Sequence, residues 1–131
     1  MLANGRHCVW LTRLDLGSRT LTFDVVQWLT GEEADEAFHR DHPEAPDVHV
    51  PNGYYIVNQN PRLRTLPVQR GAAVSVLVPS HGSVHQTIPF AALPRYLSDD
   101  IEPNDGKLWY NPFWLTVRND RIVAVFEQYI P

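Results

Sequence analysis

The stretch Phe113–Tyr129, FWLTVRNDRIVAVFEQY, decides the fold class of this chain. Apolar and polar residues alternate on both sides of Asn119-Asp120, a pattern typical of strands with one buried face. Asn and Asp tolerate positive φ, so the dipeptide predicts a two-residue hairpin turn. Counting outward from that turn gives a register in which one face is wholly apolar. Its facing pairs are Val117 with Ile122, Leu115 with Ala124, and Phe113 with Phe126.

Similar strand patterns recur upstream of this hairpin, as apolar or β-branched runs bounded by turn residues. The predicted strands are Val9–Asp15, Thr20–Val26, Tyr54–Asn58, Leu63–Val68, Ala73–Val78 and Val84–Ile88. The clearest helix signal is a capping box, in which Thr30 and Glu33 would each satisfy the other's backbone N–H. We expect helices over residues 31–40, ended by Pro43, and over Ala91–Leu97.

Seven or eight short strands and two short helices predict a mainly β (α+β) domain. A small antiparallel β-barrel would hide the strand edges. A strongly curved sheet with a helix packed on it is the alternative. The chain has 131 residues, the size of one domain, and no linker or repeat divides residues 1–131. We therefore expect a single globular domain.

The composition excludes several classes of protein. Charged residues make up 20% and aromatic residues 11%, which argues against disorder. The formal net charge is −4 and the basic residues are scattered, so we expect no nucleic-acid partner. Cys8 is the only cysteine, so no intrachain disulfide can form. No run reaches the ~18 apolar residues of a transmembrane helix. As written, residues 1–8 lack a signal-peptide pattern, so we expect a cytoplasmic protein, or an exported one if the chain is trimmed.

Three stretches together resemble a known family. They are Arg19–Ala34 (RTLTFDVVQWLTGEEA), Pro51–Val68 (PNGYYIVNQNPRLRTLPV) and Lys107–Pro131 (KLWYNPFWLTVRNDRIVAVFEQYIP). They are similar, in the same order, to a family of small uncharacterised actinobacterial proteins, many of which look exported or lipid-anchored. This chain departs from the family in having no export segment and in its His-bearing stretch, Phe38–Val50. The resemblance implies an architecture and no reaction.

Aromatic residues at strand starts and loop ends form the main candidate binding set. Mouths of barrels bind small ligands through aromatic rings and a few polar groups. Arg62 and Arg64 alternate along a strand, so both guanidiniums lie on one face and could hold an anion or an acidic partner. The candidate ligand-binding residues are Trp10, Trp28, Tyr54, Tyr55, Trp109, Trp114, Arg62 and Arg64. Core packing or a protein-partner surface accounts for the same aromatic pattern.

Three histidines form a candidate metal site. His39 and His42 share a helical face and His49 follows, with Asp41 between, and His with carboxylate suits Zn²⁺ or Ni²⁺. Histidines at a helix C-terminus also complement the helix dipole in solvent. Neither an H-E-x-x-H motif nor a cysteine pair supports the metal interpretation.

No motif carries a full set of catalytic groups. Ser80-His81 and Ser83-x-His85 lie in a Gly-containing turn without a G-x-S-x-G elbow, and Cys8 is expected to be a half-buried strand residue. We expect Glu127 to point outward or to pair with an arginine such as Arg64. The preferred hypothesis is a non-enzymatic module without a cofactor, a monomer or homodimer that binds a small molecule or a protein. The alternatives are a small enzyme with a His or Asp general base in an apolar barrel cavity, and a His-rich metal-binding protein.

Overall fold

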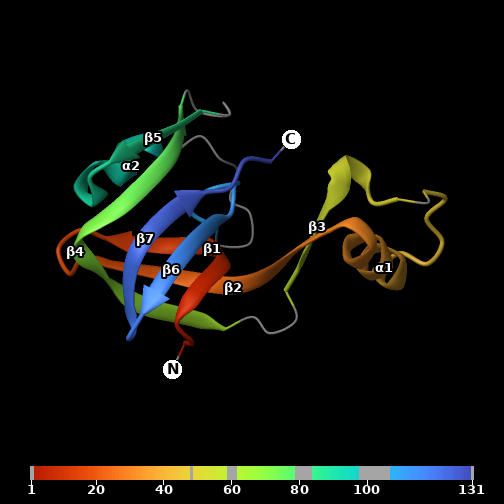
Figure 1. The fold of residues 1–131 in the computed structure, drawn as a ribbon, viewed down its shortest axis with the longest axis horizontal. Coiled ribbons are helices and arrows are strands. Elements are labelled where there is room, and N and C mark those ends of the chain that lie inside the picture. Colours follow the sequence, from red (N-terminus) through yellow and green to blue (C-terminus); the bar gives the residue numbers. More distant parts are fainter. Residues whose placement is uncertain (1, 48, 59–61, 79–83, 98–106, 131) are drawn as a thin grey trace.

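The computed structural model describes residues 2–47, 49–58, 62–78, 84–97 and 107–130. Within these ranges, seven strands and two short α-helices follow one another (Figure 1). The strands are β1 (Gly5–Asp15), β2 (Thr20–Thr30), β3 (Tyr54–Val57), β4 (Leu63–Val78), β5 (Val84–Ile88), β6 (Phe113–Arg118) and β7 (Arg121–Glu127). The helices are α1 (Gly31–Asp41) and α2 (Leu93–Tyr96), with short 3₁₀ segments η1 (Pro51–Gly53) and η2 (Phe90–Ala92).

Five of the strands close into a barrel, so the predicted small β-barrel with two short helices is confirmed. Neighbouring strands lie in the order β3-β2-β1-β6-β7-β4-β5, and a further pairing of β2 with β4 closes the ring. All pairs are antiparallel except β4–β7, which is parallel. The expectation of a purely antiparallel barrel was therefore wrong at one pair. The reason is topological, because a closed ring with an odd number of strands cannot alternate direction throughout.

Two strands of this ring, β2 and β4, extend beyond it. Thr20–Asp24 of β2 pair with β4, whereas Gln27–Thr30 pair with β3. The far end of β2, together with α1 and β3, therefore lies outside the barrel, to the right in Figure 1. β4 first pairs with β2, bends at Gly71, and then lies between β7 and β5. Gly71 has φ +82°, a conformation that favours glycine. The two strands expected over 63–68 and 73–78 are therefore one bent strand.

The barrel interior is filled by side chains. Apolar residues of all five barrel strands form one buried cluster, which η2, α2 and Trp109 complete. The largest side chains with almost no exposed surface include Trp109, Phe23, Phe113, Leu11 and Leu21. Protein interiors are close-packed, so these side chains occupy most of the described core.

The β6–β7 hairpin confirms the predicted turn and corrects the predicted register. Asn119 and Asp120 have φ of 52° and 61°, as a tight hairpin turn requires, and Val117 faces Ile122. A bulge next to this pair then shifts the register, so that Leu115 faces Val125 and Phe113 faces Glu127. A shift of one residue exchanges the two faces of a strand. Phe126 is therefore exposed, and Glu127 is buried.

Helix α1 begins at the expected place but without the expected cap. The helix spans Gly31–Asp41, close to the predicted 31–40. Thr30 is the N-cap in an extended conformation, yet its side chain makes no capping hydrogen bond. The capping box was therefore wrong, although its position marked the helix start. Glu32 and Glu33 in the first turn and His39 and Arg40 in the last still complement the helix dipole.

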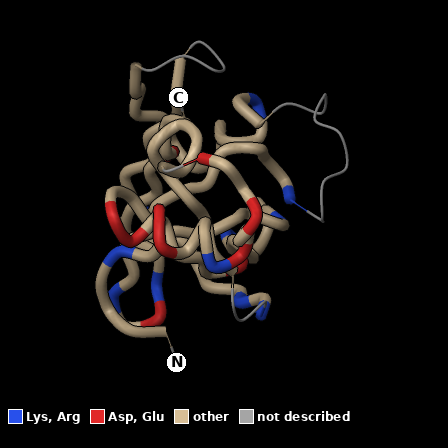
Figure 2. The backbone as a smooth tube through the Cα atoms, turned by 90° about the vertical axis from the view of Figure 1, so that its right-hand side faces the viewer, with Lys and Arg blue, Asp and Glu red and all other residues tan. Residues whose placement is uncertain are grey.

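Basic and acidic positions are interspersed along the described chain. In the view of Figure 2, Lys and Arg positions lie among Asp and Glu positions, and no continuous basic strip crosses this side of the molecule. No helix among the described residues is long and apolar enough to cross a membrane.

Candidate functional site

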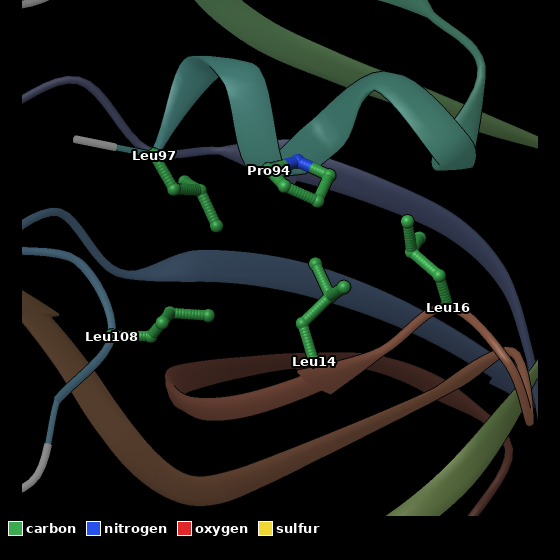
Figure 3. A pocket seen from close by; sticks show the side chains of 5 residues that line it. All are labelled: Leu14, Leu16, Pro94, Leu97 and Leu108. Atoms are coloured by element: carbon green, nitrogen blue, oxygen red, sulfur yellow. The ribbon is translucent and has the colours of Figure 1, made fainter. Parts of the chain in front are cut away.

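An apolar pocket lies between α2 and the end of the β1–β2 hairpin (Figure 3). Its volume is about 340 Å³. Three separate segments supply the lining: the end of β1 and its turn, α2 with the residue after it, and the segment that precedes β6. The described lining residues are Leu14, Leu16, Pro94, Leu97 and Leu108, and their side chains face one another across the space.

The pocket is anchored to the barrel on one side and open on the other. Leu97 belongs to the buried core cluster, and Leu14 and Leu108 pack against it. The backbone N–H of Leu108 donates to the carbonyl of Leu11 at 2.7 Å, which ties this wall to β1. At the rim, Leu16 is 44% exposed.

A second, polar pocket of about 260 Å³ lies beside β1. Trp10 and Asp24, which face each other in the β1–β2 pair, form part of its wall. Thr12, Asn58, Leu63 and Lys107 are the other described lining residues. Of the predicted ligand-binding residues, Trp10 lines one of the two described pockets.

Fixed groups hold the charges of this polar pocket. The Lys107 ammonium lies over the Trp10 ring, 4.0 Å from its centroid. Asp24 accepts a hydrogen bond from the Asn58 carboxamide at 2.6 Å and a longer one from the backbone N–H of Arg62 at 3.3 Å. Of the two predicted arginines, Arg62 therefore contacts Asp24 through its backbone N–H. Arg64 faces Phe23 in the β2–β4 pair.

Three of the other predicted aromatic residues lie in the lobe formed by α1 and β3. Trp28 stacks on Tyr54 with ring centroids 4.7 Å apart. The Tyr55 hydroxyl donates to Asp41 at 2.8 Å. Loss of solvent raises the pKa of Tyr55, and the bond to Asp41 raises it further. These rings pin the β3 strand to β2 and to the helix, which is a structural use of the aromatic set.

Trp109 and Trp114 also make fixed contacts around the C-terminal strand. Trp109 is 1% exposed and donates its indole N–H to the Glu127 carboxylate at 2.8 Å. Trp114 is half-buried, donates to the side chain of Gln128 at 2.7 Å, and carries the Arg6 guanidinium 4.9 Å from its ring centroid.

Glu127 is the centre of a buried polar network that the sequence did not reveal. One carboxylate oxygen accepts from the backbone N–H of Leu77, and the other accepts from Trp109 and from the Asn111 carboxamide, each at 2.8 Å. Glu127 is 3% exposed. The expectation that it points outward or pairs with Arg64 was therefore wrong. All three partners are N–H donors, which suits a carboxylate in its acceptor-only form.

The structure gives each candidate metal-binding histidine its own partner. His39 Nε2 lies 2.6 Å from the carbonyl of Asp47, and His49 Nδ1 lies 2.8 Å from a carboxylate oxygen of Asp35. His42 instead packs against the Phe38 ring. Within the described ranges, no three His, Cys, Asp or Glu side chains are grouped so that they could hold a metal ion. His39 and His49 thus fasten the segment after α1 to the helix.

The remaining catalytic candidates are Cys8 and the Ser and His residues between positions 80 and 85. Cys8 is 3% exposed, more deeply buried than expected, and burial raises its thiol pKa from 9.0 to about 12. Its thiolate is therefore scarce at neutral pH, which makes it a poor nucleophile. Ser80, His81 and Ser83 lie outside the described residues. His85 stacks on Phe126 at 4.0 Å and bonds to the carbonyl of Glu127 at 2.7 Å.

Comparison with known proteins gives no match to this chain: neither a family model, nor a curated protein, nor a solved structure is similar enough to report. The resemblance to the actinobacterial family stays a prediction.

Proposed function

We propose that this protein is a small non-enzymatic module that binds a molecule with a hydrocarbon chain in the pocket between α2 and the β1–β2 hairpin. The observation that carries the proposal is the pocket's lining, in which every described residue is aliphatic. A ligand there would be recognised through the area of hydrocarbon that it removes from water.

The volume sets the size of the ligand. At roughly 30 Å³ for each water-sized group, the 340 Å³ of the pocket hold a chain of about ten carbons. Burial stabilises each CH₂ by about 0.8 kcal/mol, so ten of them contribute about 8 kcal/mol before the cost of association. That cost is at least about 4 kcal/mol, which leaves about 4 kcal/mol or less and places the expected Kd at about 1 mM or weaker.

The chemistry of the described side chains favours binding over catalysis. General acid–base catalysis needs a titratable group within hydrogen-bond reach of the substrate. None of the five described lining residues carries one. The buried carboxylate of Glu127 accepts hydrogen bonds from three N–H donors, and the Cys8 thiol is held protonated by its raised pKa.

A series of unbranched alkanols, from butanol to dodecanol, tests the proposal. Each added CH₂ should tighten binding about fourfold, the equivalent of ~0.8 kcal/mol, until the pocket is full at about ten carbons. Methyl NMR resonances of the leucines report both the affinity and the place of binding. The expected shifts are confined to Leu14, Leu16, Leu97 and Leu108.

Two exposed leucines provide a matched pair of variants. Leu16, at the rim of the pocket, and Leu63, in the polar pocket, are 44% and 61% exposed, so Leu16→Asp and Leu63→Asp should both leave the fold intact. Leu16→Asp should weaken binding of decanol about tenfold, and Leu63→Asp should leave it unchanged. Affinity that does not depend on chain length, or that falls equally in both variants, would refute the proposal.

A further inference from the structure

The polar pocket beside β1 contains two opposite charges that do not neutralise each other. Lys107 and Asp24 both line it, yet their charged groups are more than 4.0 Å apart, since the ion pairs within the described chain are Arg40–Asp41 and His49–Asp35. Each charge is instead held by neutral groups. A pocket that keeps a cation and an anion apart is complementary to a ligand with the opposite arrangement.

The cationic end is held by the indole of Trp10. The Lys107 ammonium lies 4.0 Å from the ring centroid, well inside the ~6 Å range in which a cation is attracted to an aromatic face. An ammonium has three N–H donors, and the ring engages the charge without accepting all of them. Lys107 can therefore donate to an anionic group while it stays over the ring.

The anionic end is held by hydrogen bonds. The Asn58 carboxamide donates to one oxygen of Asp24 at 2.6 Å, and the backbone N–H of Arg62 donates to the other at 3.3 Å. Each carboxylate oxygen can accept about two hydrogen bonds, so both retain capacity for another donor. These bonds orient Asp24 before any ligand arrives, which lowers the cost of binding an ammonium.

Apolar side chains flank the anionic end. The Trp10 side chain forms one part of the wall, and Leu63, which faces Asp24 in the β2–β4 pair, is 61% exposed. Trp10 and Leu63 lie on either side of Asp24 and give the ligand two apolar surfaces to cover. The pocket thus combines a donor for a carboxylate, an acceptor for an ammonium and a hydrophobic contact.

We propose that this pocket binds a free α-amino acid with an apolar side chain. The carboxylate of the ligand would bind Lys107, its ammonium would bind Asp24, and its side chain would lie against Trp10 and Leu63. The size agrees, because 260 Å³ hold about nine groups of ~30 Å³, and leucine has about nine non-hydrogen atoms. This site is separate from the aliphatic pocket and does not depend on the function proposed for it.

Three related probes test the need for both charges: L-leucine, leucinamide, which lacks the carboxylate, and N-acetyl-L-leucine, which lacks the ammonium. Titration calorimetry and saturation-transfer NMR on the full chain give the affinities. We expect L-leucine to bind with a millimolar or tighter Kd and each blocked derivative to bind at least tenfold more weakly, since a charged hydrogen bond is lost.

The matching protein variants are Lys107→Met and Asp24→Asn, with Arg70→Met as the control because Arg70 is exposed on β4 and lines neither described pocket. Lys107→Met should abolish the preference for L-leucine over leucinamide. Asp24→Asn should abolish the preference for L-leucine over N-acetyl-L-leucine. The control should behave as wild type. Far-ultraviolet circular dichroism confirms that each variant is folded before it is titrated.

Two results would overturn this proposal. One is the absence of L-leucine binding to the wild-type chain at 10-fold the expected Kd, about 10 mM. The other is equal affinity for L-leucine and both blocked derivatives, which would show that the charges of Lys107 and Asp24 do not contact the ligand. Because the alkanol experiment uses Leu16→Asp, failure at one pocket is distinguishable from failure at the other.

Discussion

Replacement of Glu127 by glutamine should destabilise the protein more than any other single-atom change to a carboxylate of the described chain. Glu127 is 3% exposed, and its two oxygens accept three hydrogen bonds. Glutamine has nearly the same shape but presents one oxygen and one NH₂ group. Whichever way the amide is turned, its NH₂ points at an N–H donor of the protein.

The structure predicts how the amide is oriented and how much stability is lost. Turning the oxygen toward Trp109 and Asn111 preserves two bonds, both now to a neutral acceptor, and directs the NH₂ against the N–H of Leu77. The loss of one bond to a charged group, with a buried N–H left unsatisfied, costs about 3 kcal/mol. A domain of this size is stable by only about 5–15 kcal/mol, so the change is a large fraction of the total.

Urea denaturation monitored by tryptophan fluorescence measures this loss directly. Glu127→Gln should lower the free energy of unfolding by about 3 kcal/mol and the Tm by about 10 °C. The control is Glu36→Gln on the exposed side of α1, which should change stability by less than about 0.5 kcal/mol. If Glu127→Gln were as mild as Glu36→Gln, the three hydrogen bonds would not contribute to stability and the reasoning would be refuted.

Four further changes test other parts of the structure. Cys8 should react with a maleimide at pH 8 about a thousandfold more slowly in the folded protein than in the unfolded chain, because burial raises the pKa of its thiol from 9.0 to about 12. The stabilising contribution of the neutral, buried thiol is therefore complete below pH 9 and is lost as the pH rises toward 12. The hydrogen bonds from His49 and from the backbone N–H of Val50 lower the pKa of Asp35. The stability that these bonds contribute is therefore present at neutral pH and is lost as the pH falls through the lowered pKa. Asp35→Asn should speed hydrogen exchange at the Val50 amide, and unchanged exchange would show that Asp35 does not hold the segment around Val50. Gly71→Ala should lower the free energy of unfolding by about 1 kcal/mol or more, because its φ is +82°, whereas Gly17→Ala, at a glycine without positive φ, should cost less. Asp120→Gly should raise that free energy by about 0.5 kcal/mol, because Asn119 and Asp120 both have positive φ; a loss of stability would contradict the turn assignment.

The fold was predictable wherever local chemistry determines it. The Asn119-Asp120 turn, the start of α1 and the strand alternation depend on residues that are neighbours in sequence, and the structure confirms them. The bulge in the β6–β7 pair was not predictable, since an alternation of apolar residues does not reveal where one residue is skipped. That single shift reversed the expected places of Phe126 and Glu127.

The candidate site was less predictable than the fold. Trp10 is a predicted ligand-binding residue because aromatic rings at strand starts and loop ends are typical of binding sites. The other residues that line its pocket, among them Asp24, Asn58 and Lys107, come from distant segments of the chain. The leucines of the aliphatic pocket gave no signal, because a leucine beside a pocket has the same sequence pattern as one in a core. Only the position of α2 distinguishes the two.

The closure of the barrel explains why the predicted aromatic residues ended mostly as structural groups. An eight-stranded barrel is just wide enough for side chains to fill it or to hold one small ligand, and this barrel has five strands. Its interior is therefore occupied by its own side chains, which include the rings of Phe23, Phe113 and Trp109. The N–H and O–H groups of Trp109, Trp114 and Tyr55 find fixed partners, as buried or half-buried polar groups must. The two described pockets lie at the outer side of the barrel, one between α2 and the β1–β2 hairpin and one lined by Trp10 and Lys107, so the binding that we propose uses the outer surface of this fold.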